Sequence, residues 1–335
     1  MPLRPEAQRS WDGARVVVTG AGGFIGSHLV EQLVERGADV TAFVRYNSRS
    51  AAGFLEANGL KSEVRVVAGD ITETDTVRSL VDGADTVFHL AALVGIPYSY
   101  VHPSEVVDVN AIGTLNVLVA ARESDVAKVV VTSTSEVYGS ARSIPMSEEH
   151  PKQPQSPYAA SKVAADALAL SFHRSFQSPV AVVRPFNTYG PRQSDRAIIP
   201  TIISQALRGG DIVLGNLAPR RDLTFVTDTV AGFLAVASSP ASVGRELNLG
   251  YGASISVGDL AARIASIVGV EPTIRHADER ARPASSEVDD LVSDATAARE
   301  TLGWAPEVDL DEGLRRTIDW VREHSELYDP TAYRI

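Results

Sequence analysis

Short runs of β-branched and aliphatic residues alternate with amphipathic stretches through the first half of the chain. The runs predict strands at 15–19, 39–44, 64–68, 86–89, 128–132 and 180–183. Helical patterns separate several of them, at 24–36, 103–122 and 157–176. Strand–helix alternation predicts an α/β fold with a doubly wound parallel sheet, covered by helices on both faces. Such sheets bind ligands at the carboxyl ends of their strands.

From about residue 189 the elements become shorter and prolines separate them. We expect helices near 197–208, 228–238, 257–268 and 312–324, with brief strands near 223–226 and 246–249. A chain of 335 residues exceeds one typical domain. The pattern therefore predicts a first domain over 1–188 and a smaller α/β substrate-binding lobe over 189–335. A segment near 223–238 is expected to return to the first domain.

Composition excludes several kinds of site. The chain has 42 acidic and 31 basic residues, a net charge of −11, which argues against a nucleic-acid-binding surface. It has no cysteine, so disulfides, thiolate metal sites and cysteine nucleophiles are excluded, and we predict no metal. The polar segment 1–13 lacks a signal-peptide pattern, and no stretch approaches the roughly 20 apolar residues that span a bilayer. We expect a cytoplasmic protein without a membrane partner.

A glycine-rich turn follows the first predicted strand and opens the first predicted helix. Gly20, Gly23 and Gly26 have the spacing that allows a tight turn, close approach of a pyrophosphate, and close helix–strand packing. An ordinary glycine-rich turn is the alternative, but this one begins a long α/β alternation. We therefore predict a Rossmann-type dinucleotide site that includes Gly20, Gly22, Gly23, Phe24, Ile25 and Gly26.

The end of the second strand reports which dinucleotide is used. An acidic residue there binds a ribose 2′-hydroxyl, whereas arginine accommodates a 2′-phosphate. This chain has no carboxylate there and instead offers Arg45, Asn47, Ser48 and Arg49. The residues lean slightly toward NADP over NAD, although the two arginines could equally be solvated loop charges.

The ends of the third and fourth strands complete the cofactor side. Asp70 can accept a hydrogen bond from an adenine amino group, or can cap the following helix, and Ile71 comes next. Leu90, Ala91 and Ala92 follow the fourth strand and let a cofactor approach. We interpret His89 as a packed, hydrogen-bonded histidine rather than a base.

Tyr158 and Lys162 are four residues apart in a helical stretch and share one face. A free phenol is a poor base at neutral pH, and an adjacent ammonium favours the phenolate. Together they can take the proton of an alcohol while its hydride passes to a nicotinamide. The pair is therefore a candidate catalytic centre.

Thr134 and Glu136 follow the fifth strand, at its carboxyl end. If the backbone stays extended there, the two side chains point to the same side. The Thr134 hydroxyl could bind a substrate oxygen, and the Glu136 carboxylate could take a proton made acidic by a ketone. An exposed turn residue is the alternative for Glu136. Oxidation alone does not need this carboxylate, so it suggests a second chemical step.

These motifs resemble an extended short-chain dehydrogenase/reductase of the NAD-dependent epimerase/dehydratase family, whose members act on nucleotide sugars. The resemblance covers nearly the whole chain. It rests on the glycine motif, Asp70, the pair Ser133-Thr134, the Tyr158/Lys162 pair and the segments 184–191, 220–228, 302–304 and 312–314.

Within that family, 133–139 resembles 4,6-dehydratases and UDP-glucuronate decarboxylases more than 4-epimerases, which usually lack Glu136. Enzymes acting on dTDP-glucose typically have aspartate where this chain has Ser135, whereas GDP-mannose dehydratases have serine or threonine. The segments 91–100 and 282–288 are most similar to UDP-N-acetylglucosamine 4,6-dehydratases of the legionaminic-acid type. That group usually has arginine at the position of Asp290.

The resemblance implies C4 oxidation, loss of water from C5 and C6, and hydride return to C6, with a tightly bound cofactor. It assigns catalysis to Thr134, Ser135, Glu136, Tyr158 and Lys162. It adds Asn110, Thr132, Tyr158, Lys162 and Pro185 to the cofactor site. Substrate would be bound by Val94, Asn187, Ile198, Arg221 and Arg282. The family commonly forms homodimers through helices that would be 103–122 and 157–176 here.

Several alternatives stay open. The chain could be a GDP-mannose or dTDP-glucose 4,6-dehydratase, a 4-epimerase or a UDP-glucuronate decarboxylase. A non-enzymatic dinucleotide sensor could share the fold, but such proteins usually lack the tyrosine and lysine.

Overall fold

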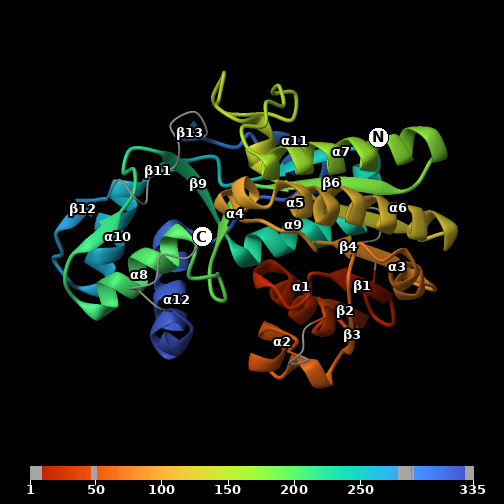
Figure 1. Ribbon diagram of the computed structural model, residues 1–335, viewed down its shortest axis with the longest axis horizontal. Helices are drawn as coiled ribbons and strands as arrows, with labels where there is room; N and C mark the ends of the chain where they lie inside the picture. Colours follow the sequence, from red (N-terminus) through yellow and green to blue (C-terminus); the bar gives the residue numbers. More distant parts are fainter. Residues whose placement is uncertain (1–9, 47–50, 278–287, 289, 329–335) are drawn as a thin grey trace, which may run out of the picture.

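A seven-stranded parallel sheet forms the centre of the molecule (Figure 1). The structure is a computed structural model that describes residues 10–46, 51–277, 288 and 290–328. The strand order is β10-β6-β5-β4-β1-β2-β3. The strands are β1 (Arg15–Thr19), β2 (Asp39–Arg45), β3 (Arg65–Gly69), β4 (Thr86–His89), β5 (Lys128–Thr132), β6 (Val180–Pro185) and β10 (Glu246–Leu249). The predicted doubly wound α/β fold is confirmed.

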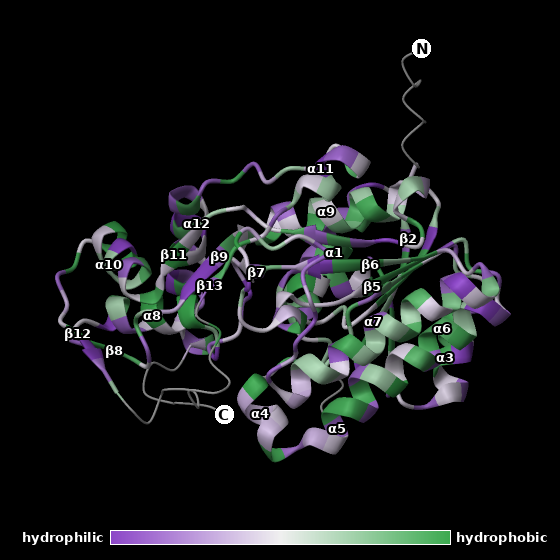
Figure 2. Cartoon of the chain, turned by 90° about the horizontal axis from the view of Figure 1, so that it is seen from above, coloured by the Kyte–Doolittle hydropathy of each residue, from purple (hydrophilic) through white to green (hydrophobic). Residues whose placement is uncertain are grey.

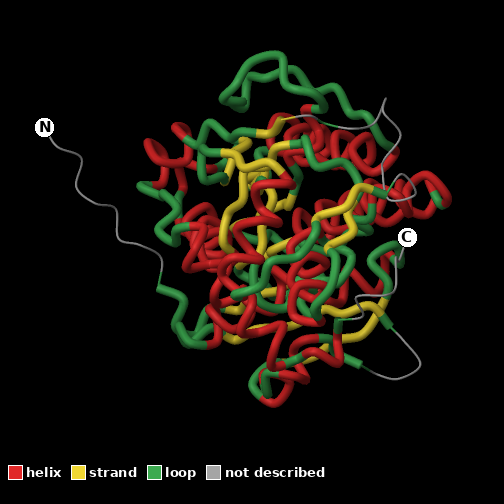
Figure 3. Tube along the Cα trace, turned by 90° about the vertical axis from the view of Figure 1, so that its left-hand side faces the viewer, coloured by secondary structure: helices red, strands yellow, loops and turns green. Residues whose placement is uncertain are grey.

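Helices cover both faces of this sheet because successive strand residues point to opposite sides. Val16 and Val18 pack in the cluster that contains α1 (Phe24–Val34) and α9 (Val226–Ser238). Val17, between them, packs on the other side with α3 (Thr74–Val81), α6 (Gly113–Glu123) and α7 (Pro157–Phe176). Strands buried on both faces read as continuous apolar runs, which is why the sequence revealed them. Figure 3 shows the strands enclosed by helices and loops.

The predicted helix over 103–122 is interrupted. It consists of α5 (Pro103–Val107), a π-helical turn (Asp108–Ile112) and α6. By length and mean hydropathy, 1.3, the run Pro103–Glu123 could cross a membrane, but half of that window is buried inside the protein. Figure 2 shows α5, α6 and α7 on the same face of the sheet. Packing within the fold accounts for the buried half of this apolar run.

Short elements precede and follow this run. Between β2 and β3 lie α2 (Phe54–Ala57) and a 3-10 turn (Leu60–Ser62), and α4 (Ile96–Val101) precedes α5. Another 3-10 turn, Ser135–Tyr138, follows β5.

The second lobe carries two small sheets. The first is formed by β7 (Asn187–Tyr189), β9 (Arg220–Phe225), β11 (Ser254–Ser256) and β13 (Asp290–Leu291). The second pairs β8 (Ile212–Leu214) with β12 (Ile274–His276). The helices here are α8 (Ile198–Arg208), α10 (Val257–Val268) and α12 (Leu310–Glu323). Two 3-10 turns, Pro240–Ser242 and Ser325–Leu327, and α11 (Thr296–Leu302) complete the described elements.

The chain crosses between the two lobes more than once, so a single boundary at residue 188 needs correction. Strand β10 lies far beyond that boundary but forms the edge of the main sheet beside β6. Of the expected return segment, α9 packs on the main sheet, whereas Leu223–Phe225 belongs to β9 in the small sheet. Side-chain periodicity shows that a strand exists, but its partner is chosen by contacts distant in sequence.

Candidate active site

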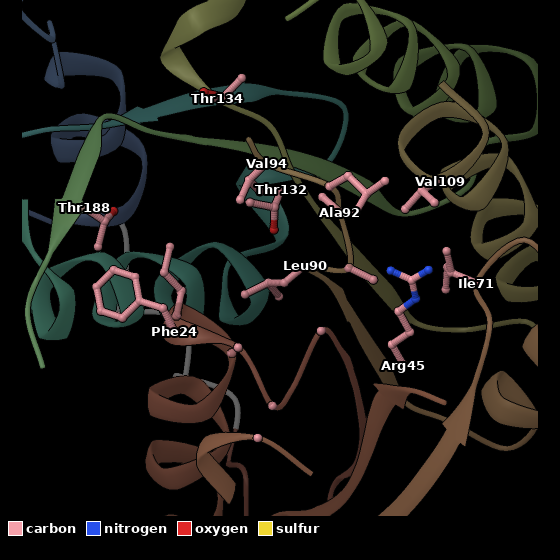
Figure 4. A pocket seen from close by; sticks show the side chains of 18 of the residues that line it. Phe24, Arg45, Ile71, Leu90, Ala92, Val94, Val109, Thr132, Thr134 and Thr188 are labelled. Carbon is pink, nitrogen blue, oxygen red and sulfur yellow. The ribbon is translucent and has the colours of Figure 1, made fainter. Parts of the chain in front are cut away.

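A cavity of about 800 Å³ opens at the carboxyl ends of β1, β4, β5 and β6 (Figure 4). Twenty of the residues expected at the site line it. They are Gly20, Gly22, Gly23, Phe24, Ile25, Gly26, Arg45, Asp70, Ile71, Leu90, Ala91, Ala92, Val94, Thr132, Thr134, Ser135, Glu136, Tyr158, Pro185 and Asn187. The carboxyl ends of parallel strands meet at one edge of a sheet, which brings these distant segments together.

The glycine turn is packed too tightly for side chains. A Cβ on Gly20 would lie 2.9 Å from the Ala91 backbone nitrogen, and the residue has a φ of +71°. A Cβ on Gly26 would lie 2.2 Å from the Gly20 carbonyl oxygen. The turn opens α1, where free backbone N–H groups and the helix dipole favour an anion. These residues fit the pyrophosphate of a dinucleotide.

Three buried polar atoms of residues on the cavity wall lack hydrogen-bond partners within the described chain. They are the Thr132 hydroxyl, the Asn187 side-chain nitrogen and the Gln193 side-chain oxygen. Leaving such groups unpaired costs free energy, so a ligand that satisfies them gains affinity. This also fits a polar ligand spanning the cavity.

Arg45 extends from the end of β2 toward Ile71 and Val109 (Figure 4). Its side chain is 71% exposed, and its Nη2 lies 3.6 Å from a carboxylate oxygen of Glu105. The other Glu105 oxygen accepts a hydrogen bond from Tyr98 at 2.6 Å. Asn47 and Ser48 lie outside the described residues, so their predicted contacts stay predictions.

Asp70 forms a local turn rather than a helix cap. Its Oδ1 accepts hydrogen bonds from the backbone and the hydroxyl of Thr72, at 2.9 and 2.8 Å. The bond from the Thr72 backbone lowers the pKa of Asp70. The carboxylate lines the cavity and stays ionised at neutral pH.

Residues 51–53 close the cavity over the glycine turn, and no sequence pattern indicated this. Phe54 donates its backbone N–H to the Gly22 carbonyl at 3.1 Å. A Cβ on Gly22 would lie 2.5 Å from the Ala52 carbonyl oxygen. Thr188, Gln193 and Val109 also line the cavity without having been predicted. These contacts are distant in sequence, and small or apolar residues carry no local signal of them.

The pairing of Thr134 and Glu136 on one side was predicted for an extended backbone after β5. The backbone there is not extended beyond Thr134. Ser135–Tyr138 forms a 3-10 turn, and the Thr134 hydroxyl accepts a hydrogen bond from the Glu136 backbone N–H at 3.3 Å. This capping turn places Thr134, Ser135 and Glu136 together on the cavity wall. Threonine and serine side chains compete for backbone hydrogen bonds, which explains why the strand ends here.

The Thr134 hydroxyl lies close enough to the Tyr158 phenol to lower the pKa of Tyr158. Burial raises the pKa of Tyr158 above its usual range, and the Glu136 carboxylate adds to this. The lowering expected from Lys162 is not seen, because desolvation of the buried phenol dominates. Tyr158 is therefore a neutral phenol at rest.

Lys162 lies one turn further along α7, buried and behind the cavity wall rather than on it. Burial lowers the pKa of Lys162 to about 8. The lysine is thus close to titration just above neutral pH, as suits a group that takes part in moving protons.

His89 and Asn110 serve the structure of the site. The Thr19 hydroxyl lies 2.9 Å from His89 Nδ1, and the Thr114 hydroxyl lies 3.0 Å from Nε2. Because Thr114 already donates to a backbone carbonyl, we assign the His89 proton to Nε2. Burial lowers the pKa of His89 to about 3, so it stays neutral. Asn110 does not line the cavity: it binds both backbone groups of Leu93, and Ser161.

Two of the expected substrate residues do not line the cavity, and the structure does not describe a third. Ile198 and Arg221 do not line the cavity, and Arg282 lies outside the described residues. Arg221 donates to the Val288 carbonyl at 2.7 Å and to the Arg220 carbonyl at 2.9 Å. Val94 does line the cavity and is 68% exposed.

The known proteins that this chain resembles are nucleotide-sugar dehydratases and epimerases. Residues 17–317 match the family described as GDP-mannose 4,6 dehydratase. The chain is 35% identical to the UDP-glucose 4-epimerase of Mycolicibacterium smegmatis, over 93% of this chain and 100% of that one. It is 34% identical to a dTDP-glucose 4,6-dehydratase of Streptomyces griseus, over 94% and 96%.

A solved structure extends the likeness to three dimensions. The dTDP-glucose 4,6-dehydratase DesIV of Streptomyces venezuelae, solved with NAD and TYD bound, superposes with a TM-score of 0.85. It is 30% identical, over 94% of this chain and 99% of that one. Together with the cavity and its tyrosine, these matches show that the chain belongs to the GDP-mannose 4,6-dehydratase family, within the extended short-chain dehydrogenases/reductases that act on nucleotide sugars.

Proposed function

We propose that this protein is a nucleotide-sugar 4,6-dehydratase that converts UDP-N-acetylglucosamine to a 4-keto-6-deoxy sugar nucleotide. The observation that carries the proposal is the position of Glu136. Its carboxylate lines the same cavity as Tyr158 and Thr134, within electrostatic reach of the phenol. Epimerisation at C4 needs only Tyr158 and Thr134, which act on the C4 hydroxyl. Elimination also needs a base that removes the C5 proton.

Tyr158 acts first, by taking the proton of the sugar C4 hydroxyl. Thr134 lies beside the phenol, and in this proposal its hydroxyl binds the same substrate oxygen. The phenol is neutral at rest, so it first releases its own proton to bulk water, and the phenolate that results is the form that takes the C4 proton. Lys162 supplies the positive charge that stabilises the phenolate as it forms. A bound nicotinamide dinucleotide supplies the hydride acceptor for C4 and the hydride donor for C6.

Glu136 performs the elimination. The C4 ketone acidifies the C5 proton, which the carboxylate abstracts and then delivers to the departing C6 hydroxyl as water. Ser135 lines the cavity next to Glu136, and in this proposal it binds the leaving oxygen. C5 then regains one proton, which balances the one taken by Tyr158. The net change is loss of one water with no net oxidation, so the cofactor remains bound through turnover.

The cofactor in this proposal is NAD. The Glu105 carboxylate beside Arg45 disfavours a ribose 2′-phosphate at that place and offsets the arginine's charge. This reverses the slight lean toward NADP that the sequence suggested. The preference for UDP-N-acetylglucosamine rests on the likeness of 91–100 and 282–288 to that enzyme type and on Ser135.

The test is mass spectrometry of products after incubation with UDP-N-acetylglucosamine, UDP-glucose, UDP-glucuronate, dTDP-glucose and GDP-mannose. Loss of one water from UDP-N-acetylglucosamine alone is the expected result. Unchanged mass with an inverted C4 would instead identify an epimerase, and loss of carbon dioxide a decarboxylase. Water loss from dTDP-glucose or GDP-mannose, but not from the UDP-sugar, would contradict the proposed substrate.

A homodimer is also part of the proposal. Val101, Val107 and Ile112 leave apolar side chains exposed on α4, α5 and the π-helical turn. Sedimentation equilibrium should give twice the chain mass, and Val107→Asp should give a monomer. A wild-type monomer at micromolar concentration would contradict it.

A further inference from the structure

A buried carboxylate lies directly behind the catalytic helix face. Asp166 is on α7, one turn after Lys162 and two turns after Tyr158, and it is fully buried. Its Oδ2 accepts a hydrogen bond from the Ser133 hydroxyl at 2.8 Å and another from Arg184 at 2.8 Å. Ser133 immediately precedes Thr134, which caps the 3-10 turn Ser135–Tyr138. Asp166 therefore binds the residue just before this turn.

Other charges enclose the Asp166–Arg184 pair. Arg184, on β6 and fully buried, also donates to Glu246 of β10 at 2.7 Å and to the Tyr138 hydroxyl at 2.6 Å. Lys152, from the loop before α7, pairs with Glu246 and lies 3.9 Å from Asp166. Two cations therefore balance two anions, and Lys162 adds one further positive charge beside Asp166.

Stability alone does not account for this cluster. Desolvation of buried ions often costs as much as their attraction returns, and apolar residues of similar size frequently replace such pairs without loss. The Asp166 Oδ1 atom has no hydrogen-bond partner within the described chain, so the carboxylate is not satisfied as a purely structural group would be. The Asp166 carboxylate differs from a purely structural ion-pair partner in its position: it binds Ser133 and lies one helical turn from Lys162.

We propose that Asp166 is a positioning residue for the active site: through Ser133 it fixes the segment 133–136 against α7, and its carboxylate acts on Lys162, one turn earlier on the same helix. The inference rests on the proposed function for its catalytic meaning. The Ser133 bond keeps Thr134 against Tyr158, while the charge acts along the helix without touching substrate.

The surrounding charges agree with this role. Burial lowers the pKa of Lys162 to about 8, and Asp166 is the group that opposes this by raising it. From β4, His89 faces Lys162 as a neutral ring. Burial raises the pKa of Tyr158, and the Glu136 and Asp166 carboxylates add to the rise. Removing the Asp166 charge should therefore lower both pKa values.

The decisive experiment titrates Lys162 directly. The chain has four lysines, Lys61, Lys128, Lys152 and Lys162, so the Cε carbon signals of ¹³C-lysine protein can be resolved by NMR and assigned with Lys162→Gln. In Asp166→Asn the Lys162 midpoint should fall by about one pH unit. The control Glu246→Gln removes a carboxylate from the same cluster, remote from Lys162, and should leave that midpoint in place.

Activity provides the second readout, with kcat followed against pH. Both limbs of the profile should move to lower pH in Asp166→Asn and not in Glu246→Gln. Ser133→Ala keeps the charge but loses the hydrogen bond, so kcat should fall about tenfold with both limbs unmoved and KM little changed. If Asp166→Asn does not fold, the double variant Asp166→Asn/Arg184→Gln neutralises both partners of the buried ion pair and leaves no unpaired charge. The Lys162 midpoint should again fall.

An unmoved Lys162 midpoint in a folded Asp166 variant overturns the inference, as does a Ser133→Ala enzyme with wild-type kcat. Failure of the proposed function has a different signature. In that case the wild type shows no product with any nucleotide sugar, while the Lys162 midpoint still responds to Asp166→Asn.

Discussion

Gly26 lies against the carbonyl oxygen of Gly20, where a Cβ on Gly26 would be only 2.2 Å away. Gly26→Ala should therefore push α1 from the glycine turn and lose most of the bound dinucleotide. Cofactor released from denatured protein measures this. Gly258→Ala is the control, because a Cβ there meets nothing closer than 3.6 Å. Wild-type cofactor content in Gly26→Ala would contradict the assigned role of the turn.

Glu136→Gln should stop the reaction after C4 oxidation. Loss of a positioned general base typically costs about 10²–10⁴-fold in rate, so water loss should slow by at least about 100-fold. Reduced nicotinamide should then accumulate, visible by its absorbance. Glu149→Gln, an exposed neighbour in the loop before α7, should behave as wild type. Normal water loss without reduced cofactor would show that Glu136 is not the C5 base.

Glu105→Gln should shift the cofactor preference. Denatured wild-type protein should release NAD. The variant removes the negative charge 3.6 Å from Arg45 and should bind NADP about tenfold more tightly relative to NAD. Exchange of the bound cofactor against mixtures of both dinucleotides measures the ratio. Glu123→Gln breaks a comparable exposed pair with Arg78 and should leave the ratio unchanged. Release of NADP from wild type would refute the proposed preference.

Acid should destabilise the fold through His28. Burial lowers the pKa of His28 to about 4, whereas the unfolded chain binds the proton near 6.5. Because the unfolded state binds more protons between these values, stability is retained above pH 6.5 and lost as the pH falls toward 4. The loss amounts to about 2 kcal/mol between pH 7 and pH 5.

Denaturant unfolding at several pH values tests this. His28→Gln can still bond the Pro191 carbonyl and should flatten the pH dependence by that amount. His102→Gln, an exposed histidine, should not change it. An equally steep decline in His28→Gln would assign acid lability to other groups.

Local sequence was sufficient to predict an element wherever its hydrophobic periodicity or a single turn motif determined it. The helix Pro157–Phe176 was expected over the same residues, because Ser156 caps it, Pro157 suits its first turn and small apolar residues continue it. It carries Tyr158 and Lys162 one turn apart, as their spacing predicted. The glycine turn and the β-branched strands were likewise readable from the residues themselves.

The tertiary structure decided the rest, for a physical reason. Glu246–Leu249 reads as a strand, but only its pairing with β6 shows that it belongs to the main sheet. The phenol of Tyr158 looked ready to ionise beside Lys162, whereas burial keeps it neutral. Asp166 gave no signal in the sequence, yet it joins Ser133 to Arg184 across 33 and 18 residues of chain. Burial and electrostatic environment are set by groups remote in sequence, so the sequence by itself determined the elements and their chemistry, and the fold alone decided how each group is charged and held.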